Sequence, residues 1–243
     1  MSARILHADA TKPADWERAL KGEKADALVT DPPYCILTRR KKSGEARDKK
    51  EKKIERGPLR RFEDVREYRE FTRTWLKLAA AWLAPTAAMV VWTNLLGKAP
   101  IITAADELGW VHLRGEFVWG KRTREGNSGE EILRVVEVAL VLTRVSAPPP
   151  QTEDPAIPWA VVAGYDDDQE GARWGGHPSH KPFGVLEPLI RSFSRPDRLV
   201  VDPFAGSGSI PLAAARLGRR AVGMELEEEW AERGQRRISE ATT

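Results

Sequence analysis

Short apolar runs alternate along this chain with stretches whose apolar residues recur every three or four positions. The runs are rich in Val, Leu and Ala with few polar interruptions, which is typical of parallel strands covered on both faces. The alternation favours one α/β domain over residues 1–243, a mainly parallel sheet with helices on both faces. The predicted strands are Arg4–Ala8, Ala25–Thr30, Ala87–Thr93, Val111–Trp119, Val135–Thr143, Arg198–Val201 and Arg220–Glu225.

The strongest helical pattern lies between residues 65 and 83. Tyr68, Phe71, Trp75, Leu78 and Trp82 are spaced by three and four positions and form one apolar stripe. Further helices are predicted at about 13–21, 97–108, 183–194, 207–217 and 227–240.

Two polar segments, 38–61 and 146–176, interrupt the pattern, and both are expected to be long loops. The first holds twelve Lys and Arg against four Asp and Glu, a net charge of +8; since the whole chain carries +3, the rest carries −5. Residues 146–172 hold six acidic and no basic residues. Concentrated basic charge favours contact with phosphates, or else marks a solvated loop that binds nothing.

Neither a run of about 18 apolar residues nor a charged-then-apolar leader is present, so we expect a cytoplasmic protein without membrane attachment. Cys35 is the single cysteine, which excludes an intramolecular disulfide.

Asp31-Pro32-Pro33-Tyr34 follows directly after the predicted strand 25–30, where parallel strands form a ligand crevice. The two prolines fix the backbone, so a carboxylate, a carbonyl and an aromatic face project into one place. Asp31 and the Pro32 carbonyl would accept from an exocyclic amino group and localise its lone pair, while Tyr34 would stack on an extruded base. A strand-ending turn with an incidental acid is the alternative.

A glycine turn joins the predicted strand 198–201 to an Ala-rich helix. Gly206 and Gly208 permit a tight turn with close approach of the backbone to a ligand. The next strand ends at Glu225, which can accept hydrogen bonds from both hydroxyls of a ribose. No Lys-Ser/Thr and no third glycine follow, so a nucleoside cofactor without pyrophosphate is favoured. A structural turn with a surface acid is the alternative.

The segment 177–182, His-Pro-Ser-His-Lys-Pro, precedes the helix predicted from residue 183. His, Ser and Lys near a helix N-terminus can bind a carboxylate. Two histidines at this spacing also fit a metal site, but no matching cluster accompanies them, so no metal is expected. Cys35 is interpreted as packing beside Tyr34 rather than as a nucleophile. Trp92 and Trp119 end predicted strands and are candidates to border the cleft.

DPPY at 31–34, HPSHKP at 177–182 and FAGSG at 204–208, in this order, resemble the beta-class amino-methyltransferases of DNA. The resemblance covers about 1–37, 62–145 and 174–240. It implies a class I methyltransferase fold, Rossmann-like with seven strands, and S-adenosylmethionine as methyl donor without a metal. It assigns catalysis to Asp31, Pro32, Pro33 and Tyr34.

The resemblance also assigns a set of residues to the cofactor. Glu225 would hold the ribose, the methionine carboxylate would meet the segment around Ser179 and Lys181, and Asp9 would meet the adenine, although Ala8 stands where relatives carry Gly. The full set is Asp9, Ala10, Asp31, His177, Ser179, Lys181, Asp202, Phe204, Ala205, Gly206, Ser207, Gly208, Glu225 and Leu226.

Many relatives place a substantial target-recognition region before HPxxKP, whereas this chain has only the short segment 146–176 there. Because that segment is acidic, phosphates should repel it. We therefore expect the basic insertion to grip double-stranded DNA. The residues expected to do so are Arg39, Arg40, Lys41, Lys42, Arg60 and Arg61. A homodimer and a cognate restriction endonuclease are left open as partners.

The predicted function is site-specific methylation of N6 of adenine in DNA, because the family tends to carry Asp at the first motif position for adenine and Ser for cytosine. N4 of cytosine is the alternative. An RNA or protein-amide methyltransferase fits less well, since in such enzymes the cofactor loop usually precedes the catalytic tetrapeptide. A DNA-binding relative without catalysis is the remaining candidate.

Overall fold

The computed structural model describes residues 3–35, 62, 64–122, 135–144, 159–164, 167–174 and 180–241. His177, Ser179 and the six basic residues predicted to bind DNA (Arg39, Arg40, Lys41, Lys42, Arg60 and Arg61) lie outside this part of the chain. In chain order the elements are β1 Ala3–His7, α1 Pro13–Leu20, β2 Ala25–Thr30, α2 Val65–Ala81, β3 Leu83–Thr93, α3 Leu95–Glu107, β4 His112–Arg122, β5 Val135–Thr143, β6 Ala160–Gly164, α4 Glu170–Arg173, α5 Phe183–Phe193, β7 Leu199–Asp202, α6 Ser209–Arg216, β8 Arg220–Glu225 and α7 Glu228–Ala241.

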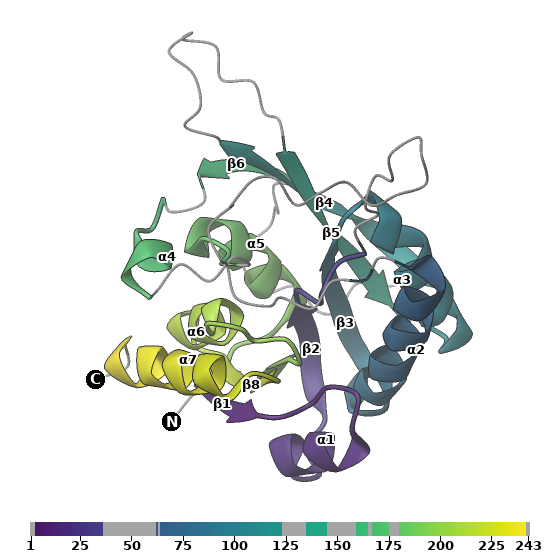
Figure 1. The fold of residues 1–243 in the computed structure, drawn as a ribbon, viewed down its shortest axis with the longest axis horizontal. Coiled ribbons are helices and arrows are strands. Elements are labelled where there is room, and N and C mark those ends of the chain that lie inside the picture. Colours follow the sequence, from purple (N-terminus) through teal and green to yellow (C-terminus); the bar gives the residue numbers. More distant parts are fainter. Residues whose placement is uncertain are drawn as a thin grey trace, which may run out of the picture.

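One sheet organises the described residues, with strand order β1-β8-β7-β2-β3-β5-β4-β6 (Figure 1). Its first five strands are parallel, β5 is antiparallel to both β3 and β4, and β6 is parallel to β4. The mainly parallel α/β prediction is confirmed. The prediction of seven strands is wrong, because the sheet has an eighth strand, β6, within the segment predicted as loop.

The extra strand has a physical explanation. Ala160–Gly164 is a five-residue apolar run among Pro, Gly and Asp, too short to show a period of its own. It becomes a strand because its backbone pairs with β4, from Val118 opposite Ala160 to Arg122 opposite Gly164. The short helix α4, also in the segment predicted as loop, follows it.

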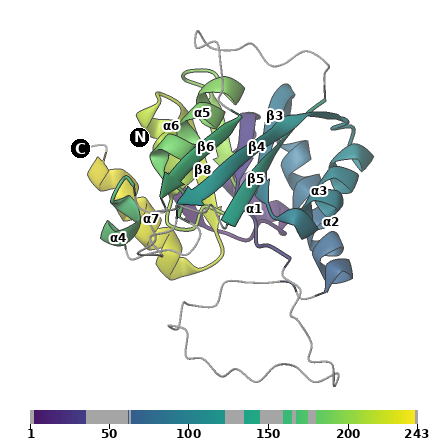
Figure 2. The same ribbon diagram turned by 90° about the horizontal axis from the view of Figure 1, so that it is seen from above.

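The helices cover the sheet on both faces, and Figure 2 shows the strands between the two groups. One buried cluster joins α1, α2 and α3 to the sheet, and a second joins α5, α6 and α7 to the opposite face. Buried strands carry apolar side chains on both sides; all six residues of β2 are buried, for example. This agrees with the prediction that continuous apolar runs form strands covered on both faces.

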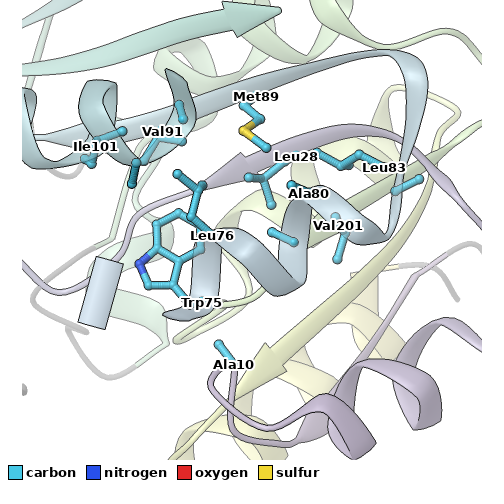
Figure 3. Packing of buried hydrophobic residues seen from close by; sticks show 14 of the residues in the cluster. Ala10, Leu28, Trp75, Leu76, Ala80, Leu83, Met89, Val91, Ile101 and Val201 are labelled. Atoms are coloured by element: carbon cyan, nitrogen blue, oxygen red, sulfur yellow. The ribbon is translucent and has the colours of Figure 1, made fainter. Parts of the chain in front are cut away.

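Helix α2 shows how the periodic pattern becomes packing. Its N-terminus is capped by Asp64, whose carboxylate accepts from the Arg66 and Glu67 N–H groups. The predicted stripe faces the sheet: Tyr68, Phe71 and Trp75 are buried, whereas Leu78 and Trp82 are only partly buried. Figure 3 shows this face, with the α2 side chains Trp75, Leu76 and Ala80 beside Leu28, Met89, Val91 and Val201 of β2, β3 and β7.

The connections reverse direction between β7 and β2, which positions the site. From β2 the chain crosses through α2 to β3, on one side of β2; from β7 it crosses through α6 to β8, on the other side. Helices α2 and α6 belong to opposite faces of the sheet. In such sheets the crevice at the carboxyl ends of the two diverging strands binds ligands. No helix among the described residues is long and apolar enough to cross a membrane.

Candidate active site

The two turns singled out by the sequence lie side by side. Strands β2 and β7 pair directly, with Ala27 opposite Val200 and Leu28 opposite Val201. The loop 31–34, predicted to be catalytic and called the catalytic loop below, and the glycine turn 203–208 therefore leave adjacent strand ends. The Thr30 hydroxyl donates to Asp202 Oδ1 at 2.7 Å and joins the two ends. The expectation that these turns meet across neighbouring strand tips is confirmed.

A cavity opens between the turns and encloses about 280 Å³, counting the space open to solvent. Its wall includes one residue of the catalytic loop, one of the HPSHKP segment and most of the glycine turn. The lining residues are Asp31, Lys181, Asp202, Phe204, Ala205, Gly206, Ser207, Ser209 and Ile210.

The glycine turn adopts a backbone that other residues resist. Gly206 has φ +51° and Gly208 has φ +81°, both in the left-handed region. A Cβ at Gly208 would also lie 2.7 Å from Cδ1 of Ile5. The Gly206 N–H donates to Glu225 Oε2 at 2.8 Å, and the Ala205 N–H donates to the Met224 carbonyl at 2.8 Å. The turn is therefore tied to the end of β8.

The acids around the cavity are held in distinct ways. Glu225 accepts from the Gly206 N–H on Oε2 and from the Glu227 N–H on Oε1, and burial raises its pKa. Each oxygen keeps a second lone pair for a ligand hydroxyl. Burial raises the pKa of Asp202 to about 7, against hydrogen bonds from the Thr30 hydroxyl and the Phe204 N–H that lower it.

An aromatic wall supports the glycine turn from the α2 side. The Phe204 ring lies edge-on to Trp75, with centroids 5.3 Å apart, and 5.8 Å from the Phe71 ring. Phe62 extends this wall through Phe71 at 4.7 Å. The apolar stripe on α2 therefore contacts Phe204 and holds it at the cavity wall.

The catalytic loop is fixed to its neighbours by its backbone. The Phe62 N–H donates to the Tyr34 carbonyl at 3.3 Å, and Asn94 Nδ2 donates to the Cys35 carbonyl at 2.7 Å. Asn94 also caps α3, since its Oδ1 accepts from the Gly97 N–H at 3.0 Å. Cys35 is buried, and burial raises the pKa of its thiol, which agrees with a packing role.

A cluster of four charged side chains lies behind this loop. Lys181 Nζ donates to Asp31 Oδ2 at 2.5 Å and to Glu137 Oε2 at 3.1 Å. Lys121 donates to Glu137 Oε1, and the Tyr34 hydroxyl donates to Glu137 Oε2 at 3.3 Å. Asp31 Oδ1 is buried and accepts no hydrogen bond from the described residues.

The electrostatics of this cluster follow from burial and pairing. Burial raises the pKa of Asp31, and Glu137 adds to the rise while Lys181 opposes it. Burial also acts to raise the pKa of Glu137, but the two lysines outweigh it and lower that pKa to about 2. Burial, with the charges of Asp31 and Glu137, raises the pKa of Tyr34 well above its usual value, so the hydroxyl stays protonated.

Sequence reasoning missed Glu137 and expected a different partner for Lys181. Lys181 lines the cavity as expected, but its ammonium pairs with Asp31 and Glu137. The signal for Glu137 was a single charge within the apolar run Val135–Thr143, since a buried acid in such a strand requires a partner. Trp92 and Trp119 border this cluster: Lys181 Nζ lies 4.8 Å and 5.9 Å from their ring centroids.

Of the predicted cofactor residues in the described part of the chain, Asp9, Ala10 and Leu226 do not line the cavity. Ala8, next to Asp9, donates its N–H to the Glu225 carbonyl at 2.8 Å, so Asp9 follows the neighbouring strand end. The Asp9 carboxylate accepts from Thr11 N–H at 2.9 Å and Thr11 Oγ1 at 2.7 Å. Ala10 is buried, and Leu226 is 48% exposed beside Glu225.

Two acids of the segment 146–176, Asp168 and Glu170, have side-chain partners elsewhere in the protein. Asp168 accepts from the Phe183 N–H at 2.9 Å and lies 3.2 Å from His180 Nε2. Glu170 pairs with Arg237 at 3.2 Å and with Arg216 at 3.4 Å. These contacts join Asp168 to the beginning of α5 and Glu170 to α6 and α7, so the two arginines compensate the charge of Glu170.

The residues present fit a nucleoside cofactor with a sulfonium methyl group. The glycine turn brings backbone close to the cavity, Phe204 offers an apolar face, and Glu225 offers acceptors for ribose hydroxyls. The unpartnered Oδ1 of Asp31 supplies a buried acceptor at the same cavity. Within the described part of the chain, no three His, Cys, Asp or Glu residues are grouped as metal ligands.

Comparisons with known proteins agree with this geometry. The family described as DNA methylase, of the N6 and N4 type, matches residues 25–236. The methylase YubD of Escherichia coli (strain K12) is 51% identical over 88 residues, which span 35% of this chain and 37% of that protein. Type II methyltransferase M2.LlaDCHI of Lactococcus lactis subsp. cremoris is 22% identical over 255 residues, covering 100% of this chain and 91% of that protein.

The fold also resembles a solved structure. The crystal structure of the M1.HpyAVI complex with S-adenosylmethionine aligns with a TM-score of 0.65 and 22% identity. The alignment covers 97% of this chain and 99% of that one.

Proposed function

The chain belongs to the DNA methylase family that acts at N6 or N4, and from this premise we propose that it methylates N6 of adenine in DNA with S-adenosylmethionine as donor. One observation carries the proposal. Asp31, whose Oδ1 is buried without a hydrogen-bond partner among the described residues, and the glycine turn line the same cavity, at the ends of two adjacent parallel strands.

The residues of the catalytic loop would activate the amino group. An exocyclic amino nitrogen is a poor nucleophile because its lone pair is delocalised into the base. Asp31 Oδ1 accepts one amino N–H and the Pro32 carbonyl accepts the other, so the nitrogen becomes more tetrahedral. Tyr34 stacks on the extruded base, and Pro33 keeps the loop rigid. Holding both reactants in one cavity supplies much of the rate acceleration.

S-Adenosylmethionine supplies an electrophilic methyl group when bound. Glu225 would hold the ribose hydroxyls, and Phe204 with the backbone of Ala205, Gly206, Ser207 and Gly208 would form the surface under the nucleoside. Asp9, Ala10 and Leu226 would lie around the adenine, beside Glu225. Asp202 and Thr30 hold the two loops together, and His177 and Ser179 are proposed for the methionine carboxylate.

The basic insertion 38–61 would hold DNA, because its net charge of +8 suits phosphates. The chain would be a beta-class enzyme, since its catalytic motif precedes its cofactor loop. The residues proposed to contact DNA are Arg39, Arg40, Lys41, Lys42, Arg60 and Arg61. A cytoplasmic location follows from cellular DNA as substrate. A homodimer and a cognate endonuclease stay predictions.

N4 of cytosine is the second candidate, because the matched family covers both nitrogens. Asp at the first position of the catalytic tetrapeptide favours adenine. The same acceptor arrangement suits either amino group, so only the product distinguishes them.

The deciding experiment identifies the product. Unmodified DNA is incubated with wild type or Asp31→Asn and S-adenosylmethionine, digested to nucleosides and analysed by mass spectrometry; RNA and protein are run in parallel. We expect N6-methyladenine from wild type only, while calorimetry shows that both proteins bind the donor. N4-methylcytosine would refute the adenine assignment, and donor binding without methylation of DNA would refute the function.

A further inference from the structure

We infer that Glu137 is a positioning residue for methyl transfer: it fixes the Tyr34 hydroxyl and, through Lys181, the Asp31 carboxylate, so both ends of the catalytic loop are set by one side chain of the sheet. The inference rests on the proposed function. No motif in the sequence assigns Glu137 a role, and it does not line the cavity.

The topology explains how a residue of β5 reaches the loop. Strand β5 is antiparallel to β3, with Thr93 opposite Val138, so the beginning of β5 lies at the edge where β2 and β3 end. Glu137 is opposite Trp119 on β4, and Lys121 is the diagonal neighbour two residues further along. The beginning of antiparallel β5 and the end of its neighbour β4 thus deliver one acid and one base to the catalytic edge.

The contacts give Glu137 a central place. Its Oε2 accepts from both the Tyr34 hydroxyl, at 3.3 Å, and Lys181 Nζ, at 3.1 Å, while its Oε1 accepts from Lys121. Lys181 continues to Asp31 Oδ2 at 2.5 Å. Asp31 therefore has one oxygen held by the protein and the other, Oδ1, left for the amino group.

The buried charges of this cluster balance, so each side chain needs its partners. The side chains of Lys181, Asp31 and Glu137 are only 3%, 9% and 15% exposed. Two acids and two lysines give a neutral set, and removing one member leaves a buried charge uncompensated, which is costly. The Trp92 and Trp119 rings flank Lys181, so its ammonium has little freedom to move away from the two carboxylates.

A merely structural role for Glu137 would stabilise the fold and leave the chemistry unchanged. A positioning role predicts a defined change at Asp31. Glu137 raises the pKa of Asp31 and Lys181 lowers it. Glu137→Gln should therefore lower the pKa of Asp31, and Lys181→Met should raise it. Opposite shifts from two variants of one cluster distinguish positioning from general destabilisation.

The test compares wild type, Glu137→Gln, Lys181→Met and Lys98→Met in steady-state methylation of DNA between pH 5 and 9. Lys98→Met is the matched control, because it removes the lysine of another Lys–Glu pair, with Glu116, that does not belong to the cluster around Asp31. We expect Glu137→Gln to lower kcat about 10- to 100-fold, since small misplacements have effects of this size, with KM for the donor changed less than about twofold. The acid limb of kcat should move to lower pH in Glu137→Gln and to higher pH in Lys181→Met. Lys98→Met should lower kcat less than about threefold.

A second readout does not depend on DNA as substrate. The pKa of the Asp31 carboxyl is followed by ¹³C NMR, assigned with Asp31→Asn, in wild type and both cluster variants. Folded Glu137→Gln with wild-type kcat and an unshifted Asp31 titration overturns the inference. If circular dichroism shows that Glu137→Gln does not fold, Glu137→Asp takes its place. A Glu137→Asp variant with wild-type kcat and a wild-type Asp31 titration overturns the inference, and one with reduced kcat and retained donor binding supports it. A wild type that methylates no DNA refutes the proposed function alone, and the titration still decides the role of Glu137.

Discussion

The first prediction concerns Asp202 and the dependence of the free energy of unfolding on pH. The Asp202 side chain is buried at the end of β7, and burial raises its pKa from the usual 3.8 to about 7. Between these two values the folded protein keeps a proton that the unfolded chain releases, so the free energy of unfolding falls as pH rises. The difference between the two pKa values corresponds to about 4 kcal/mol, present below about pH 4 and lost above about pH 7.

Asp202→Asn removes this dependence without removing the contacts. The Asn Oδ1 can accept from the Thr30 hydroxyl and the Phe204 N–H as the carboxylate does. Between pH 5 and 8.5 wild type should lose about 3 kcal/mol that the variant keeps, so the difference in unfolding free energy should grow by that amount.

The assay is urea unfolding followed by circular dichroism at pH 5 and pH 8.5, without cofactor. Asp64→Asn is the control, because it makes the same change at an acid that caps the N-terminus of α2 and does not line the cavity. Asn caps helices as Asp does, so we expect the difference from wild type to change by less than about 0.5 kcal/mol across this range. A difference for Asp202→Asn that stays constant within about 0.5 kcal/mol would refute the reasoning.

Two further predictions concern contacts in the structure, and a third concerns the charge of the basic insertion. Gly208 has φ +81° and Ile5 nearby, whereas Gly218 has φ +76° and open space around it, so Gly208→Ala should lower the free energy of unfolding by about 1–3 kcal/mol more than Gly218→Ala. Urea unfolding of both variants measures the difference, and equal losses of free energy would show that Ile5 does not crowd a side chain at position 208. Asn94→Ala removes the hydrogen bond to the Cys35 carbonyl and should lower kcat about tenfold with donor affinity kept in calorimetry; unchanged kcat would show that the loop is held without it. Changing the six basic residues proposed for DNA to Gln should weaken DNA binding and reduce the slope of log K against log salt by up to about 5; an unchanged slope would place the phosphate contacts elsewhere.

The local pattern of this sequence determined most of the secondary structure and both chemical turns. Apolar runs predicted strands such as β2 and β8 at their observed positions, and the stripe of Tyr68, Phe71 and Trp75 predicted the face of α2 that is buried. These features depend on residues near in sequence, whose spacing alone decides which face is apolar. The positions of the turns at 31–34 and 203–208 could be predicted for the same reason, while their chemical roles stay predictions.

The tertiary structure decided which strands pair with each other and which charged side chains do. That β2 lies beside β7, about 170 residues later, depends on packing across the whole sheet, which no local spacing encodes. Ala160–Gly164 becomes a strand only because β4 offers a partner. Glu137 appeared as one acid in an apolar run, and Lys181 as a ligand for the cofactor. Antiparallel β5 places Glu137 at the edge of the sheet where β2 and β3 end, and burial there forces these charges to pair with each other and with Asp31.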